Sequence, residues 1–594
     1  MRSGQPEQIS VAPLRERSLE DRLFFPLAFV LTALMVMATL FVHALYIQYP
    51  LVFSDEALYT LHSKFLNNPR FTATMPNILY FYVYHLTSWF GIYHTVVAKV
   101  LNAVLFGLSL FPLYATARQF LSKPAAYIFS IGVVLSPVSS YSVYVMPESM
   151  YFFIFWTLAY IVVVQLPHDV AYGGLYSGLA LAALSAVKPH GLILTATIPV
   201  VLVCLYFQRP DEISVSQLVR ATLIYLAAFI VGRLIINYLV RGDFVVSPFG
   251  GYYAELLTPS MRPKRPLLSP TLWYLIRGHL SYLAVLFWPA IVLAVWPSEV
   301  SSRRTHEGAH YVALLSFSFV TLLLLILLAA KYTADVTGVA VPTQACRLHG
   351  RYYNFALGTL VLLFLARTGA ASFPLGRSRL FGFVLVGGAI AAGASAWFAF
   401  IDYCPNSLDF PEVVCFSMFR IGLALVISGC IGSAVCLAFF TRTTARLVYL
   451  AFIGTLALTT SAAVFVGQVL FISSPPQPDL AAIAVRNLVP NQIDDGIVLA
   501  RTEDPRSYRA MFQLYSLSER RILNKEVLTA DDIPADRKWA LLLDPYALKL
   551  PYYSIVRGKG FEFIQLAPGG IVATDGTNPR PGVSSRTSPG SARN

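Results

Sequence analysis

The stretch FFPLAFVLTALMVMATLFVHALYIQYPLVFSDEALY, residues 24–59, joins a long apolar run to two adjacent acids. The run itself, Phe24–Tyr46, contains no Asp, Glu, Lys or Arg. An apolar run of about 18 or more residues is long enough to cross the hydrocarbon core of a bilayer as a helix. We therefore expect a membrane-spanning helix here, with Asp55 and Glu56 placed just beyond its end.

The same pattern recurs along the whole chain. Of the 594 residues, 56% are hydrophobic and 13% are charged, whereas soluble domains carry about 25% charged residues. Apolar runs extend to Leu447–Ile472 and predict about thirteen spans, some interrupted near Pro137, Lys188 and Pro289. This composition excludes a water-soluble enzyme and predicts an all-α polytopic membrane protein.

Positive charge indicates the orientation. The formal net charge is +13, but the Lys and Arg residues lie in loops between spans and form no single basic face, which argues against nucleic acid as a partner. Arg15, Arg17 and Arg22 precede the first span, and every second loop after it is basic. Because cytoplasmic loops are enriched in Lys and Arg, we predict a multi-pass protein of the bacterial inner membrane with a cytoplasmic N-terminus and a C-terminal domain in the periplasm.

The chain divides into four predicted parts. They are a cytoplasmic N-terminal segment (1–23), a transmembrane domain with long extracytoplasmic loops (24–472), a small periplasmic α/β domain (473–574) and a disordered tail (575–594). In the third part, helix-like stretches at 480–488 and 507–517 alternate with strand-like stretches at 497–500, 540–543 and 561–566. Cys404 and Cys415 bracket an outer loop, and whether they form a disulfide stays open.

Asp55 and Glu56 admit two interpretations. As acids at the start of a helix they would stabilise its N-terminus, a contribution of about 1 kcal/mol. Alternatively, a carboxylate at the lip of a membrane cavity acts as a general base on an acceptor hydroxyl. The residues alone leave both open.

Two further charges lie at breaks between spans. Glu148, in YVMPESM, follows a proline where a span begins, and is either a helix N-terminal charge or a paired or metal-binding acid. Lys188 and His190, in VKPHGLIL, stand at the tip of a predicted helical hairpin. Lys188 either extends to the membrane surface or binds a phosphate.

A cluster of cationic and aromatic residues lies where a long loop leads into a late predicted span. QACRLHGRYYNFALG contains Arg347, His349, Arg351 and Tyr352, which are either interfacial anchors or a phosphate-binding group, since Arg offers two parallel donors. Arg233 lies inside an apolar run, where it requires an anionic ligand or an acid such as Asp243. No Walker loop, dinucleotide fingerprint or zinc signature occurs in the sequence.

These motifs together resemble the C-type glycosyltransferase superfamily of membrane enzymes. The resemblance is to the branch that uses polyprenyl-phosphate sugars and includes the lipid A aminoarabinose transferases and the protein O-mannosyltransferases. It rests on SDEALY after the first span, MPES before the fourth, VKPHGLIL at a hairpin tip and HGRYYNFALG before a late span. It implies that Asp55 is the catalytic carboxylate and Glu56 the second member of the acidic pair.

The resemblance also implies roles for the other residues. Glu148 corresponds to a second acid that orients the acceptor or holds a metal, so Asp55 and Glu148 are the candidate ligands if Mg²⁺ or Mn²⁺ is used. Lys188, Arg351 and Tyr352 would contact the lipid phosphate or the sugar, and we add Tyr59, His190, Arg233, Arg347 and His349 as candidate substrate-binding residues. The chain departs from the aminoarabinose transferases at Met75 and Leu58, where they carry Lys and Arg.

The predicted function is therefore inverting transfer of a single sugar from a polyprenyl-phosphate donor to a lipid, glycan or protein acceptor on the periplasmic side. The sequence leaves two alternative functions open. One is a transporter or lipid-sugar flippase, which would commonly show paired repeats, and the other is an enzyme of the O-antigen ligase or polymerase type.

Overall fold

The computed structural model describes residues 19–46, 53–66, 77–242, 270–295, 306–337, 347–369, 379–400, 403, 409–413, 420–439, 442–471, 477–502, 505–514, 518–550, 552–558 and 560–566. Predictions on Cys404, Cys415, Asp243, Met75 and residues 575–594 lie outside these ranges. The chain forms two compact units, Met1–Ser474 and Pro475–Asn594.

The first unit is built from helices. Its first half contains α1 (Leu19–Tyr46), α2 (Phe53–Lys64), α4 (Ile78–His85), η1 (Leu86–Tyr93), α5 (His94–Leu108), α6 (Leu110–Ala117), α7 (Lys123–Val134), η2 (Pro137–Val143), α8 (Glu148–Tyr160), η3 (Ile161–Gln165), α9 (Leu166–His168), α10 (Val170–Val187), η4 (Pro189–Ala196), α11 (Thr197–Gln208) and α12 (Val215–Arg241). Its second half contains α14 (Pro270–Val295), α16 (His306–Thr337), η7 (Gly350–Tyr352), η8 (Asn354–Ala356), α17 (Leu357–Gly369), α18 (Arg379–Phe400), η9 (Pro411–Val413), α20 (Arg420–Phe439) and α21 (Arg442–Phe471).

These helices confirm the polytopic all-α architecture. Within the described residues, nine helices are long and apolar enough to cross a membrane, and α7 and η2 form a further pair bent by 52°. The predicted breaks at Pro137 and Lys188 are confirmed. The predicted break at Pro289 is wrong, because α14 continues through that proline; neighbouring helices make proline tolerable inside a membrane helix. The exact number of spans stays a prediction.

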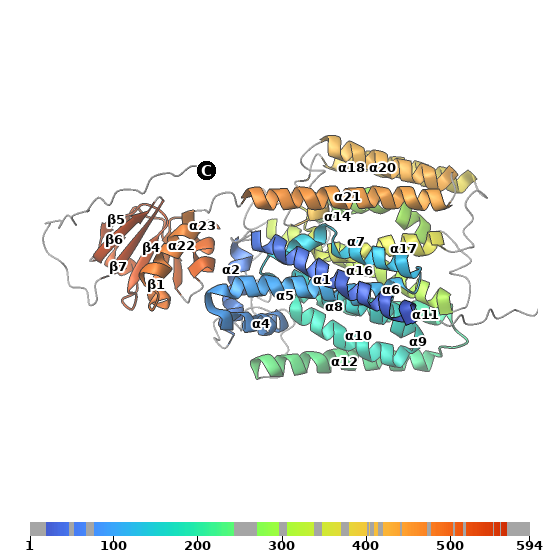
Figure 1. Cartoon of the computed structure of the whole chain (residues 1–594), viewed down its shortest axis with the longest axis horizontal. Helices are drawn as coiled ribbons and strands as arrows, with labels where there is room; N and C mark the ends of the chain where they lie inside the picture. Colours follow the sequence, from blue (N-terminus) through green and yellow to red (C-terminus); the bar gives the residue numbers. More distant parts are fainter. Residues whose placement is uncertain are drawn as a thin grey trace, which may run out of the picture. The chain divides into compact units, whose positions relative to one another are not determined.

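Helices α10 and α12 lie side by side through small residues (Figure 1). A Cβ atom on Gly178 of α10 would lie 2.4 Å from the Tyr225 carbonyl oxygen and 2.8 Å from the Ala228 Cβ of α12. One turn earlier, a Cβ on Gly174 would lie 2.9 Å from the Ala221 carbonyl oxygen. Small residues spaced by four allow helix backbones to approach closely. In a bilayer the hydrophobic effect does not drive helices together, so this close van der Waals packing is the main source of their packing energy.

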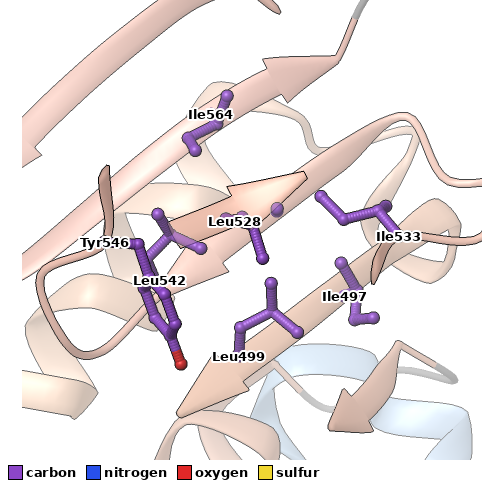
Figure 2. Packing of buried hydrophobic residues seen from close by; sticks show 8 residues of the cluster. Ile497, Leu499, Leu528, Ile533, Leu542, Tyr546 and Ile564 are labelled. Carbon is purple, nitrogen blue, oxygen red and sulfur yellow. The ribbon is translucent and has the colours of Figure 1, made fainter. Parts of the chain in front are cut away.

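The second unit is the small α/β domain that the sequence predicted. It contains α22 (Gln477–Leu488), η10 (Ile493–Asp495), β1 (Gly496–Ala500), α23 (Pro505–Leu514), β2 (Glu519–Ile522), β3 (Val527–Thr529), η11 (Ala530–Asp532), β4 (Trp539–Leu542), β5 (Ala547–Lys549), β6 (Tyr552–Gly558) and β7 (Phe561–Leu566). The larger sheet has the order β2-β1-β4-β7-β6, parallel between β2, β1 and β4 and antiparallel beyond. Figure 2 shows its apolar core, with Ile497, Leu499, Leu542 and Ile564 from the sheet.

The α10 and α12 contact generates a first prediction. Gly178→Leu should lower the melting temperature of the purified protein in detergent, because the new side chain has no room against α12 and overpacking costs about 1–3 kcal/mol. Gly132→Leu is the matched control, since a Cβ there meets nothing within 4 Å. Equal melting temperatures for the two variants would show that this contact does not limit stability.

Candidate active site

A cavity in the first unit gathers residues from segments far apart in the chain. It is lined by Asp55, Leu58, Tyr59, Asn77, Met146, Glu148, Lys188, Pro189, His190, Tyr332, Arg351 and Tyr352. Seven of the residues predicted from the motifs are among them: Asp55, Tyr59, Glu148, Lys188, His190, Arg351 and Tyr352. The cavity is therefore the candidate active site.

Helix α2 presents one acid of the adjacent pair to the cavity and buries the other. Asp55 and Glu56 both lie in the first turn of α2, so a helix N-terminal charge and a place in the site are compatible. The Asp55 side chain is 36% exposed. Glu56 is buried and its Oε1 accepts a hydrogen bond of 3.1 Å from the Val145 backbone N–H. Since successive helical residues point in different directions, only Asp55 lines the cavity.

Glu148 and Lys188 form a buried ion pair across the cavity. Lys188 Nζ donates to Glu148 Oε1 at 2.7 Å, and both side chains are at most 10% exposed. Lys188 ends α10 in an extended conformation (φ −143°, ψ 133°), as expected for a residue before proline. The lysine is thus turned into the protein, which favours a binding role over extension to the membrane surface. Glu148 Oε2 has no hydrogen-bond partner among the described residues.

Arg351 reaches the cavity from η7 and faces two carboxylates. Its Nη1 donates to Asp55 Oδ2 at 3.3 Å, and its Nε lies 3.6 Å from Asp409 Oδ1. Asp409 does not line the cavity. The aromatic ring of Tyr352 stands about 6.0 Å from both Lys188 Nζ and Arg351 Cζ, within the range of cation–π attraction.

Aromatic side chains form one wall of the cavity. The His190 ring lies 5.2 Å from the Tyr352 ring and 4.6 Å from the Tyr151 ring, measured between centroids. Tyr332 of α16 lies 5.4 Å from Tyr352. Rings with few rotatable bonds give a firm apolar surface, which suits the faces of a sugar or a prenyl chain.

Four residues predicted for the site do not line the cavity: Glu56, Arg233, Arg347 and His349. Arg233 is buried within α12. Arg347 forms an ion pair with Asp409. His349 Nδ1 lies 2.7 Å from the Thr333 hydroxyl, and burial lowers the pKa of His349 to about 4, so this imidazole is neutral near pH 7.

No sequence motif pointed to Asn77 or Tyr332, which line the cavity, or to Asp409, which faces Arg351. Asn77 Nδ2 donates to the Val187 carbonyl oxygen at 2.6 Å and so ties the start of α4 to the end of α10. Asp409 lies in the stretch LDFPEVV. An acid among apolar residues was the one feature of this stretch that could have indicated a place in the site. A single acid in a long loop does not indicate which helix end it will face.

The described residues around the cavity offer few ligands for a divalent metal ion. Among the described residues no group of three His, Cys, Asp or Glu side chains could hold a metal ion, and Asp55 and Glu148 each already face a cation. Mg²⁺ usually binds through one or two carboxylates together with substrate phosphates and waters. Asp55 and Glu148 would be the carboxylates available to it here, and no step of the proposed reaction is routed through a metal.

Comparison with known proteins gives a structural likeness at low sequence identity. No family model matches the sequence, and no curated protein matches it. The chain is similar to ArnT from Cupriavidus metallidurans bound to undecaprenyl phosphate, with 14% identity, a TM-score of 0.49 and coverage of 93% of this chain and 99% of that one. It is also similar to the oligosaccharyltransferase AglB from Archaeoglobus fulgidus in complex with an inhibitory peptide and a dolichol-phosphate, with 11% identity, a TM-score of 0.42 and coverage of 88% and 70%.

The buried ion pair generates a second prediction. Lys188→Met should lower the melting temperature strongly, because it leaves the Glu148 carboxylate buried without its countercharge, a loss of about 3–5 kcal/mol. The double variant Glu148→Gln with Lys188→Met removes both charges and should recover much of that loss. If the double variant melts below the single one, the pair is not the source of the instability.

A pH dependence of stability follows from Glu412 in η9. Burial raises the pKa of Glu412 from 4.5 to about 7, against the lowering effect of hydrogen bonds from its own backbone and from Asn354. The folded protein therefore holds this proton more tightly than the unfolded chain, so the stability that Glu412 contributes is present below about pH 4.5 and is lost as the pH rises to about 7. We expect Glu412→Gln to reduce the drop in melting temperature between pH 5 and pH 8, and an unchanged drop would contradict this assignment.

Proposed function

We propose that this protein is an inverting glycosyltransferase of the C-type superfamily. It would move a single sugar from a polyprenyl-phosphate donor to a lipid, glycan or protein acceptor on the periplasmic side of the bacterial inner membrane. The observation that carries the proposal is the meeting of Asp55, Arg351 and the Glu148–Lys188 pair around one cavity of a membrane-spanning helical unit. The four motifs of the resemblance supply these same residues.

Asp55 is the general base in this mechanism. Its side chain is partly exposed and lines the cavity, so an acceptor hydroxyl can approach it, whereas its neighbour Glu56 is buried. Asp55 takes the hydroxyl proton as the acceptor oxygen attacks the anomeric carbon. The new bond joins the acceptor oxygen to that carbon, and the bond from the carbon to the phosphate oxygen breaks. A single in-line displacement of this kind inverts the anomeric centre.

The cations of the site stabilise the leaving group. When the sugar departs, the donor phosphodiester becomes a phosphate monoester and gains negative charge. Arg351 and Lys188 lie on the cavity wall and are the groups available to receive that charge. Donors fixed in place before the reaction, in a site shielded from water, lower the barrier by several kcal/mol. Because the phosphate is already attached to the sugar, no nucleotide site is required.

Glu148 and the aromatic wall are assigned to the sugar and the acceptor. Glu148 Oε2 is buried and makes no hydrogen bond within the described residues, so it can accept one from a substrate hydroxyl or amine without losing a partner. A buried acceptor left unpaired costs free energy that a bound donor group recovers. Tyr352 and His190 would face the sugar ring beside it. The prenyl chain would lie in the bilayer, and the C-terminal domain would stand in the periplasm.

The base assignment generates a third prediction. Asp55→Asn should lower the rate of transfer from a radiolabelled polyprenyl-phosphate sugar by about 10²–10⁴-fold, the usual contribution of a general base, while donor binding is retained because the amide keeps the size of the side chain. Asp536→Asn is the control, since Asp536 is 70% exposed and lies in the C-terminal domain. Transfer and donor binding are measured separately on the purified protein in lipid nanodiscs.

Other outcomes of this experiment discriminate between functions. Full activity of Asp55→Asn would show that another group takes the proton. Movement of the lipid donor across liposome membranes without any transfer would identify a flippase. Transfer only from a diphosphate-linked donor would favour an enzyme of the O-antigen ligase or polymerase type.

A further inference from the structure

The two carboxylates that face Arg351 differ in exposure and in attachment. Asp409 is 1% exposed, whereas the Asp55 side chain is 36% exposed and stands on the cavity wall. Asp55 contacts Arg351 through one hydrogen bond of 3.3 Å. Asp409 contacts the same residue twice, because its backbone carbonyl oxygen accepts from the Arg351 backbone N–H at 2.5 Å and its carboxylate lies 3.6 Å from Arg351 Nε.

Packing holds the segment that carries Asp409 in place. The next residue, Phe410, is fully buried, with its ring centroid 5.2 Å from that of Tyr282 and 5.6 Å from that of Tyr353. Gly350 lies against the same ring, where an added Cβ would be 2.2 Å from Phe410 atoms. Residue 350 must therefore be glycine for the loop to pack this closely on η7. The backbone on both sides of the Asp409–Arg351 contact is consequently fixed.

Arg347 neutralises the other side of Asp409. Its Nε donates to Asp409 Oδ2, while Arg351 faces Oδ1. One buried carboxylate is thus shared between two arginines. A buried charge with a single partner would be costly, and Arg347 stays paired with Asp409 even when the partner of Arg351 changes.

Binding of a phosphate would place a further negative charge beside Arg351 and its two carboxylates. Among the described residues, Lys188 and Arg351 are the Lys and Arg side chains that line the cavity, and each faces a carboxylate. A donor phosphate bound to either cation therefore competes with a carboxylate for the same positive charge. The Glu148–Lys188 contact is short and buried at 2.7 Å, and the Asp409 contact is buried as well. The contact of Arg351 with Asp55 is longer than the Glu148–Lys188 contact and more exposed than either of the other two contacts, so it yields first.

We propose that Asp409 is a positioning residue for Arg351 and that Asp55 is the partner which Arg351 exchanges for the donor phosphate. This inference rests on the proposed function and deepens it. Asp409 keeps the guanidinium in place during the exchange, so that it meets the phosphate without moving. Asp55 loses its countercharge at that moment and becomes available to the acceptor hydroxyl. Binding of the donor would thereby free the Asp55 carboxylate from Arg351, so that it can act as the general base.

The test is a double-mutant cycle on transfer from a polyprenyl-phosphate sugar. Arg351→Gln should lower kcat by about 100-fold, the usual effect of losing one fixed donor to the developing charge. Asp409→Asn should lower kcat by about tenfold, because a misplaced group loses much of its effect. If Asp409 acts through Arg351, the double variant is no slower than Arg351→Gln alone. Asp409→Glu keeps the charge and should recover part of the loss.

Binding of undecaprenyl phosphate, measured by native mass spectrometry, separates positioning from general electrostatics. Asp409→Asn removes a negative charge near the site, so affinity for this lipid should stay equal or rise while kcat falls. Asp479→Asn is the matched control, since it breaks a buried ion pair of 2.7 Å with Arg509 in the C-terminal domain and should leave the kinetics unchanged. A lowered kcat in this control would assign the Asp409 effect to lost stability and overturn the proposal.

The remaining outcomes separate the inference from the function on which it rests. Additive losses in the double variant, or an Asp409→Asn kcat within twofold of wild type, overturn the positioning role and leave the glycosyltransferase intact. A wild-type protein that neither binds undecaprenyl phosphate nor transfers sugar overturns both.

Discussion

An ionised side chain that is largely buried in a protein loses hydration and must be paired with an opposite charge. Arg351 meets this requirement by facing Asp55 on the cavity side and Asp409 on the buried side. The cavity depends on this contact, because it joins α2, η7 and the segment before η9. These three parts of the chain are separated by long stretches of sequence. The buried Glu148–Lys188 pair ties two further segments together in the same way.

Breaks in the helices place these charges. Pro147 precedes α8 and puts Glu148 in its first turn. Pro189 forces Lys188 out of the helical conformation at the end of α10. A charge in the middle of a membrane helix would have to face another helix, whereas a charge at a break can turn toward a cavity. A proline next to a charged residue therefore occurs twice around the same site, as Pro147 with Glu148 and as Pro189 with Lys188.

Much of the architecture was predictable because membrane helices have a strong sequence signal. The apolar runs predicted the helices, and the alternation in residues 497–500, 540–543 and 561–566 predicted β1, β4 and β7. The sequence did not predict strands β2, β3, β5 and β6, because they are short or carry charges such as Arg520 and Arg521. Their place in a sheet also depends on pairing with strands that are distant in the sequence. Pro289 predicted a break that α14 does not have, since the effect of a proline depends on what surrounds it.

The sequence by itself determined the class of protein, its helical elements and most of the chemical groups around the cavity. Hydrophobicity and proline act locally, so their consequences can be read residue by residue. The tertiary structure alone decided that Asp55 lines the cavity while Glu56 is buried, that Lys188 pairs with Glu148, and that Arg347 and His349 lie outside the cavity lining. It also decided that Asp409 faces Arg351. These contacts join residues far apart in the chain, and the energy of an ion pair depends on distance and burial, which no single stretch of sequence contains.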